Sequence, residues 1–202
     1  MKSLDLRAAL AMIDAGGEAA LNAAGPEEAM RSLVRSYYDL LGDRDAHLKP
    51  DSLKPGEHQF FVAGAFFVTS DTRFHMLVGN MNFPPEQERL LVPIDGGHVG
   101  WVYAHRSKLI LENTDEHGEF RQYLKTSRMG SAIFAPLVWK GEFLGQIVMA
   151  AQARYTMRDA DLEALVACSR VAAGIWVAHG GPAWLLANYP PANGFYVGKD
   201  GM

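Results

Sequence analysis

Two stretches of the chain each contain a pair of apolar segments joined by a short polar turn. The first pair occupies residues 60–68 (FFVAGAFFV) and the alternating residues 73–79, and the second occupies residues 132–138 and 143–151. Aromatic and β-branched segments separated by a few turn residues are typical of β-hairpins. We therefore expect an antiparallel sheet rather than a doubly wound parallel one.

Segments with helical periodicity flank the hairpins. Helices are expected near Leu6, Leu10 and Ile13, from residue 26, from Gly97, over residues 119–125, and over residues 159–176. The helix from residue 26 carries an apolar stripe of Met30, Leu33, Val34, Tyr37, Tyr38 and Leu41. The sequence predicts an α+β fold, a central antiparallel sheet of about six strands with the N- and C-terminal helices packed on one face.

Length and charge limit the classes of function. The 202 residues are 49% hydrophobic and carry a net charge of −4, which suits one domain and does not favour nucleic acid or acidic membranes. No apolar run approaches the roughly 18 residues of a membrane span, and the N-terminus does not resemble a signal peptide. We expect a cytoplasmic protein that binds neither nucleic acid nor membrane.

Four short motifs follow one another in the second half of the chain. They are residues 97–102 (GHVGWV), 109–115 (LILENTD), 128–137 (RMGSAIFAPL) and 141–145 (GEFLG). In this order they resemble the helix start, strand with polar loop, proline-containing strand and return turn of the GAF domain, a small-molecule-sensing family related to PAS domains. The resemblance extends from about residue 57 to residue 177 and implies the antiparallel fold described above.

The chain is expected to divide into three segments. These are an N-terminal helical extension over residues 1–45, a GAF-like domain over residues 57–178, and an aromatic, proline-rich tail over residues 179–202. A polar link that contains Pro50 and Pro55 separates the first two segments. The tail is apolar enough to need a partner surface, which is its own domain, the cavity mouth or a second chain.

The resemblance implies a ligand cavity between the sheet and the side formed by residues 97–105 and 113–123. A helix N-terminus would supply N–H donors there, with aromatic walls and a few polar groups. Because the histidines can take up a proton, we expect a small polar or anionic ligand. The expected ligand-binding residues are His98, Trp101, His105, Asn113, Asp115, Phe120, Tyr123 and Ser131.

Several of these features have a purely structural alternative. Glycines 96, 97 and 100 either bring backbone N–H groups to an anion or allow tight packing. Residues 113–117 either contact a ligand or form a capped turn, and His75 is expected at the surface or in a groove. His98 and His105 are seven residues apart, unlike the i, i+4 spacing of a metal pair. We expect no metal, haem or bilin cofactor.

The single cysteine bears on catalysis. Enzymes of this family that reduce free methionine-(R)-sulfoxide depend on cysteines near the cavity, whereas Cys168 is expected to pack inside the last helix. We therefore expect a non-catalytic sensory or regulatory domain that signals through a partner protein. Two alternatives stay open: an enzyme acting on a small metabolite, with His98 or His105 as acid or base beside Asp115, and a ligand-free dimerisation module.

A homodimer is also expected. Helices of this kind commonly pair two copies in the family that the chain resembles. The expected contact consists of the apolar stripe of the helix from residue 26, together with Ile175, Trp176 and the tail around residues 184–189.

Overall fold

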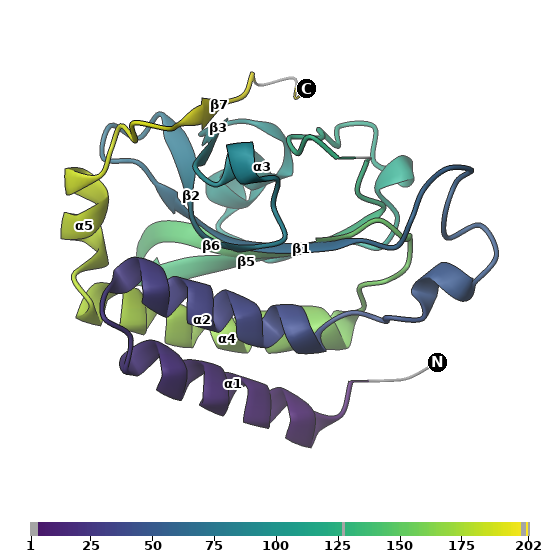
Figure 1. Ribbon diagram of the computed structural model, residues 1–202, viewed down its shortest axis with the longest axis horizontal. Coiled ribbons are helices and arrows are strands. Elements are labelled where there is room, and N and C mark those ends of the chain that lie inside the picture. Colours follow the sequence, from purple (N-terminus) through teal and green to yellow (C-terminus); the bar gives the residue numbers. More distant parts are fainter. Residues whose placement is uncertain (1–3, 127, 199–200, 202) are drawn as a thin grey trace.

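The computed structural model describes residues 4–126, 128–198 and 201. The predicted segments 1–45 and 179–202 therefore extend slightly beyond the described residues. Figure 1 shows the layers: helix α1, then helices α2 and α4, then the sheet, and helix α3 with long loops on the opposite side of the sheet. The α+β fold with its N- and C-terminal helices on one face is confirmed.

The sheet has seven strands in the order β4-β5-β6-β1-β2-β3-β7. Both predicted hairpins are confirmed, as β1–β2 and β5–β6, and neighbouring strands are antiparallel except β3 and β7. The prediction of about six strands missed β7, which the tail contributes beside β3. The strands are β1 (Phe61–Val68), β2 (Phe74–Met81), β3 (Leu90–Pro93), β4 (Leu109–Leu111), β5 (Ser131–Trp139), β6 (Glu142–Ala151) and β7 (Phe195–Tyr196).

The helices match the predicted ones with two exceptions, the absent helix over residues 119–125 and the additional helix α5 in the tail. They are α1 (Leu6–Leu21), α2 (Pro26–Leu40), α3 (Gly97–His105), α4 (Asp159–Ala178) and α5 (Gly181–Ala187), with short 3-10 turns at Ala46–Leu48, Pro85–Gln87 and Thr114–Glu116. The helix predicted over residues 119–125 is wrong, because this segment has an irregular backbone. Its backbone groups at Tyr123 and Lys125 bond to the side chain of Gln87 instead.

Strand β1 lies at the centre of the sheet and is apolar on both faces. Every residue from 61 to 67 is buried. Phe67 belongs to the larger core under α2 and α4, and Phe66 belongs to a second core on the α3 side. Because both faces are covered, the strand reads in the sequence as a continuous apolar run.

Helix α2 lies directly on the sheet. Its stripe residues Met30, Leu33 and Tyr37 are at most 1% exposed. The helix crosses β2 at Gly79, where a Cβ atom would lie 2.9 Å from the backbone N of Arg31 and the backbone C of Met30. A glycine is needed there because helix and strand backbones approach each other closely.

Part of the predicted dimer contact is buried within one chain, whereas Leu186 in its tail portion is 65% exposed. The α2 stripe is buried against the sheet, and Ile175 and Trp176 of α4 are 5% and 1% exposed within one chain. Helix α1 covers α2 and α4 as an outer layer (Figure 1). These side chains are therefore not available to a second copy.

The tail packs back on its own domain. Helix α5 places Trp184 against Trp176, with ring centroids 6.1 Å apart, and β7 pairs with β3. Among the described residues no single helix is long and apolar enough to cross a membrane. Only α4 and α5 counted together, across a bend of 67°, reach the required length and composition.

Candidate functional site

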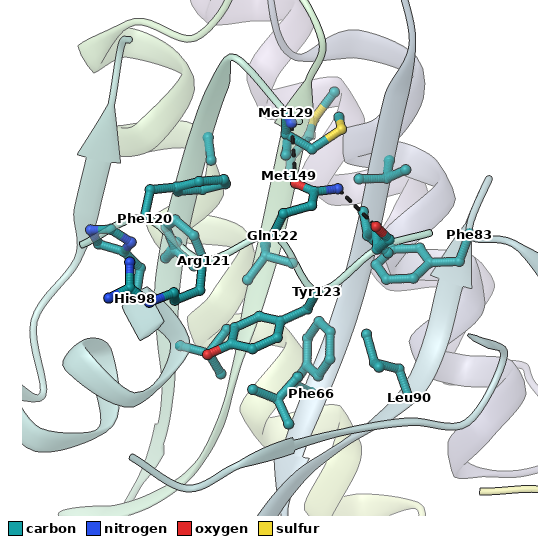
Figure 2. Close-up of a pocket in the computed structure, with 18 residues that line it drawn as sticks. Phe66, Phe83, Leu90, His98, Phe120, Arg121, Gln122, Tyr123, Met129 and Met149 are labelled. Carbon is teal, nitrogen blue, oxygen red and sulfur yellow. Dashed lines mark hydrogen bonds between the residues drawn. The ribbon is translucent and has the colours of Figure 1, made fainter. Parts of the chain in front are cut away.

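A cavity of about 80 Å³ lies between the sheet and the loops on the α3 side (Figure 2). Strands β1 and β5 form its floor with Val62, Phe66, Ala132 and Phe134. Ala132 is 2% exposed, and its small side chain leaves room above the sheet. The cavity is therefore a feature of the second core rather than of the surface.

The walls of the cavity are also mainly apolar. They include Phe83, Leu90, Tyr123, Leu124 and Met129, which come from the loop after β2, from β3 and from the segments 117–126 and 128–130. Ligand sites are usually concave and apolar with few polar groups. The lining is more apolar than the sequence-based expectation of a polar or anionic ligand implies.

Residues 117–126 and 128–130 form a cover over the cavity, and two glutamines hold it. The fully buried Gln87 donates from Nε2 to the carbonyl of Tyr123 at 2.8 Å and accepts at Oε1 from the amide of Lys125 at 2.6 Å. Gln122 accepts at Oε1 from the amide of Met129 at 3.2 Å (Figure 2). The cover is thus fixed by hydrogen bonds from side chains to an irregular backbone.

His98 is the titratable group on helix α3 that lines the cavity. Its ring centroid lies 5.7 Å from that of Phe120 and 6.4 Å from that of Phe134. Its Nδ1 atom is buried and has no hydrogen-bond partner. An unsatisfied buried ring nitrogen costs free energy unless a ligand or water pairs with it.

Cationic groups surround His98. Burial lowers the pKa of His98, the neighbouring His117, Arg121 and Arg128 lower it further, and Glu119 acts in the opposite direction. In Figure 2 the side chain of Arg121 extends toward His98 at the edge of the cavity. The mouth of the cavity near His98 therefore favours negative charge.

The glycines before α3 serve packing. A Cβ atom on Gly96 or Gly97 would lie 2.8 or 2.9 Å from the hydroxyl oxygen of Tyr123. On Gly100 it would lie 2.4 Å from the backbone C of Asp95. The structural alternative therefore accounts for all three glycines, because the wall residue Tyr123 occupies the side-chain space at Gly96 and Gly97 and the backbone of Asp95 occupies it at Gly100.

Trp101 and His105 lie on helix α3 but do not line the cavity. Their rings stack with centroids 4.2 Å apart, and His105 is exposed. The expectation that both contact a ligand together with His98 is therefore wrong, because only His98 of the three lines the cavity, next to Val99.

Ser131 and Asn113 also lie outside the lining, where they bond to the protein itself. Ser131 is fully buried, donates from Oγ to the carbonyl of Leu111 at 3.1 Å and accepts from the amide of Met157 at 3.1 Å. Asn113 caps the Thr114–Glu116 turn by accepting from the amide of Asp115 at 3.1 Å. Of the predicted ligand-binding residues, the structure brings His98, Phe120 and Tyr123 together around the cavity.

Asp115 belongs to a cluster of ion pairs beside the cover. Its carboxylate lies 2.7 Å from Nζ of Lys54, 3.0 Å from Nε of Arg154 and 3.2 Å from Nε of Arg128. Arg154 is almost fully buried and also pairs with Glu57. Burial acts to raise the pKa of Asp115, but the bonds from Lys54 and Arg154 outweigh it, so the pKa is lowered.

His75 is buried in strand β2, so the expectation of a surface or groove position is wrong. Its Nε2 lies 3.3 Å from the carbonyl oxygen of Ile94, and the ring of Tyr103 packs edge-on with a centroid distance of 5.6 Å. Burial lowers the pKa of His75 to about 4, and the charge of Arg106 adds to this effect. His75 is a neutral core residue beneath α3 at neutral pH.

Within the part of the chain that the structure describes, no group of three or more His, Cys, Asp or Glu side chains is placed to hold a metal ion. Cys168 is fully buried in α4, in the core on the opposite face of the sheet from the cavity. Burial raises the pKa of its thiol to about 12.

Comparison with known families identifies the fold. The GAF domain model matches residues 26–175. The chain belongs to the GAF domain family. GAF domains are typically small-molecule-sensing domains. The match begins at the first residue of α2, so it includes a helix that the sequence analysis placed in an N-terminal extension.

Solved GAF structures share this architecture at low sequence identity. The GAF domain of an Acinetobacter phosphoenolpyruvate-protein phosphotransferase is 14% identical with a TM-score of 0.67, covering 85% of this chain and 94% of its own. The corresponding domain from Coxiella burnetii is 16% identical with a TM-score of 0.68, covering 88% and 98%. A free methionine-R-sulfoxide reductase from Neisseria meningitidis, in complex with its substrate, is 14% identical with a TM-score of 0.68, covering 90% and 96%.

At such identities the likeness shows the fold alone. No curated protein matches the chain in sequence. The cavity must therefore be interpreted from its own residues.

The sequence analysis missed much of the lining. It did not identify Phe66, Phe83, Leu90 or Met129, because an apolar residue in a strand or loop has no pattern that distinguishes a cavity wall from ordinary core. It also missed Arg121, whose place beside His98 depends on the path of an irregular segment. The alternation of side chains between the two faces of β1 does indicate which of its residues line the cavity, since Val62 and Phe66 lie on the same face.

Proposed function

We propose that this GAF domain is a non-catalytic sensor that binds a small molecule in the cavity and passes the binding event to a partner protein. The observation that carries the proposal is an apolar cavity under a cover that Gln87 and Gln122 hold by hydrogen bonds. A ligand there would touch both the sheet and the cover. A ligand that binds one conformation of the cover more tightly than another shifts the equilibrium between the two conformations.

The position of Cys168 supports binding without turnover. Thiol chemistry requires the thiolate, and this thiol is fully buried with its pKa raised to about 12. The sheet also separates it from the cavity. This arrangement opposes a reductase activity that uses the one cysteine of the chain.

The acid–base alternative finds less support in the geometry. It pairs Asp115 with His98 or His105, but His105 is exposed on the far side of α3. The carboxylate of Asp115 is engaged by Lys54 and Arg154 outside the cavity lining. The dimerisation-only alternative is opposed by the open space of about 80 Å³.

We further propose a cytoplasmic homodimer. Leu6, Leu10 and Leu21 of the outer helix α1 are 71%, 59% and 61% exposed, and a second copy covering them would remove apolar surface from water. Light scattering is expected to give twice the chain mass. The mass of one chain at every concentration would refute the dimer and leave ligand binding unaffected.

Native mass spectrometry of the intact chain tests ligand binding. After incubation with the small-molecule fraction of a cell extract, we expect a non-covalent adduct on the native protein. The Ala132→Leu variant fills the cavity floor and should lose the adduct, whereas Ala160→Leu at the exposed start of α4 should keep it. An adduct that survives in Ala132→Leu, or none in the native protein, contradicts the proposal.

A further inference from the structure

The cavity has two chemically different ends. Its floor and walls, built around Phe66, Leu90, Val92 and Met129, offer mainly carbon atoms to a ligand. At about 80 Å³ it is roughly half the size of a dry protein cavity of about 150 Å³ that holds benzene. A body of about four carbon atoms fits such a space better than an aromatic ring.

The other end offers an unpaired polar atom among cations. Nδ1 of His98 is buried without a partner, so it can bond to a ligand without breaking a protein contact. Arg121 lines the same end. Its Nη1 donates to the carbonyl of Gly118 at 3.2 Å, which leaves other N–H groups of the guanidinium for a ligand.

A second arginine extends this cationic end. The guanidinium of Arg128 lies over the ring of Phe120, 4.6 Å from the centroid. One of its nitrogens donates to the carbonyl of Thr114 at 2.6 Å. The charged and titratable groups that face His98 are thus His117, Glu119, Arg121 and Arg128. Arg128 is also paired with Asp115 at 3.2 Å, so Arg121 is the guanidinium that we assign to the ligand.

We propose that the ligand of this cavity is a short-chain carboxylate whose aliphatic body lies over Phe66 and Ala132 and whose carboxylate is bound by His98 and Arg121. This inference rests on the proposed function and names the chemical class of ligand. An apolar body alone leaves Nδ1 of His98 unpaired, and a polar body loses the contact with the apolar lining. A charge-assisted bond to a carboxylate satisfies the histidine and the cationic mouth together.

Binding is coupled to protonation of His98. Burial and the neighbouring cations keep the imidazole neutral in the free protein, because they lower its pKa. A bound carboxylate raises that pKa. At a pH between the pKa of His98 in the free protein and its pKa in the complex, binding is accompanied by the uptake of a proton. Affinity therefore increases as the pH falls through the pKa of His98 in the complex, until the ligand itself is protonated.

Calorimetry with three probes tests the class of ligand. Isovalerate has the body and the charge, isovaleramide has the same body without the charge, and acetate has the charge without the body. We expect isovalerate to bind about tenfold tighter than isovaleramide and about fiftyfold tighter than acetate. Equal affinity for the acid and the amide, or tighter binding of the amide, overturns the assignment.

Two variants locate the charged end. His98→Leu should remove the preference for isovalerate over isovaleramide, and Arg121→Met should weaken it. The matched control His105→Leu, on the outer face of the same helix, should leave it unchanged. If His98→Leu does not fold, the ¹⁵N resonance of His98 Nδ1 in the native protein replaces it: it should shift with isovalerate, and no shift overturns the proposal.

The outcomes separate this inference from the proposed function. A cellular adduct that Ala132→Leu abolishes, together with no binding of isovalerate, refutes the carboxylate class and leaves the sensor intact. The absence of both refutes the two proposals together. Tight isovalerate binding that persists in Ala132→Leu places the carboxylate site outside the cavity and contradicts the present assignment.

Discussion

The side-chain amide of Gln87 donates to the backbone carbonyl of Tyr123 at 2.8 Å, although the two residues lie 36 positions apart in the sequence. Gln87 ends the Pro85–Gln87 turn, and Tyr123 forms a wall of the cavity. The bond joins the cover to the rim of the sheet. It also explains why the cover segment does not form a helix.

Replacing Gln87 should loosen the cover. Gln87→Met keeps the volume but leaves the carbonyl of Tyr123 and the amide of Lys125 without this partner. We expect a loss of about 1–3 kcal/mol in the free energy of unfolding and faster hydrogen exchange over residues 120–126. Glu88→Met, at an exposed neighbouring position whose carboxylate pairs with Arg31 of α2, is the control; equal exchange in both variants would show that Gln87 does not hold the cover.

Gly79 should tolerate no side chain. In Gly79→Ala the new Cβ atom would meet backbone atoms of Arg31 and Met30 at 2.9 Å, so α2 must move away from the sheet. Such overpacking costs about 1–3 kcal/mol, measurable by urea denaturation. Gly118→Ala introduces a Cβ atom into open space and should be nearly neutral. A Gly79→Ala variant as stable as the native protein would contradict the close approach of α2 and β2.

His75 should make the fold sensitive to acid. Its pKa is about 4 in the folded chain and about 6.5 in the unfolded chain. Above pH 6.5 His75 is neutral in both the folded and the unfolded chain, so it adds no pH dependence to the free energy of unfolding. As the pH falls toward 4, only the unfolded chain takes up this proton, so the free energy of unfolding decreases by about 3 kcal/mol.

The pH slope of stability isolates this histidine. His75→Leu should lose the corresponding part of the slope between about pH 6.5 and 4, whereas His58→Leu, at an exposed position, should keep it. Urea denaturation at a series of pH values gives the slope. Identical slopes in His75→Leu and the native protein would place a protonated or exposed histidine at this position.

Cys168 should be unreactive until the chain unfolds. Its thiol is fully buried and its pKa is about 12, so the folded protein has almost no accessible thiolate at neutral pH. Iodoacetamide labelling followed by mass spectrometry should be slow in buffer and complete in denaturant. Rapid labelling of the native protein would reopen the possibility of thiol chemistry.

Much of the fold follows from local patterns. The aromatic and β-branched segments joined by short polar turns predict the two hairpins, and the stripe from Met30 to Leu41 predicts the buried face of α2. The burial of that stripe also shows the limit of such patterns. Its width suggested a dimer contact, but the large side chains fill the space between the sheet and α4 within one chain.

The site was less predictable for a physical reason. The spacing of three and four residues places His98, Trp101 and His105 on successive turns of α3. It does not indicate which of them face the protein interior. The direction is set by the packing of Val99 and Val102 on the second core, which turns His105 outward. The cover depends on Gln87, a contact between distant segments that no local pattern contains.

The most direct test of ligand binding in the cavity is methyl NMR of the methionine side chains. Met129 lines the cavity, whereas Met30 and Met157 lie in the core on the other face of the sheet. When the small-molecule fraction of a cell extract is added, we expect the Met129 methyl resonance to shift while those of Met30 and Met157 stay in place. An unchanged Met129 resonance, or shifts confined to Met30 and Met157, would contradict a ligand site in this cavity.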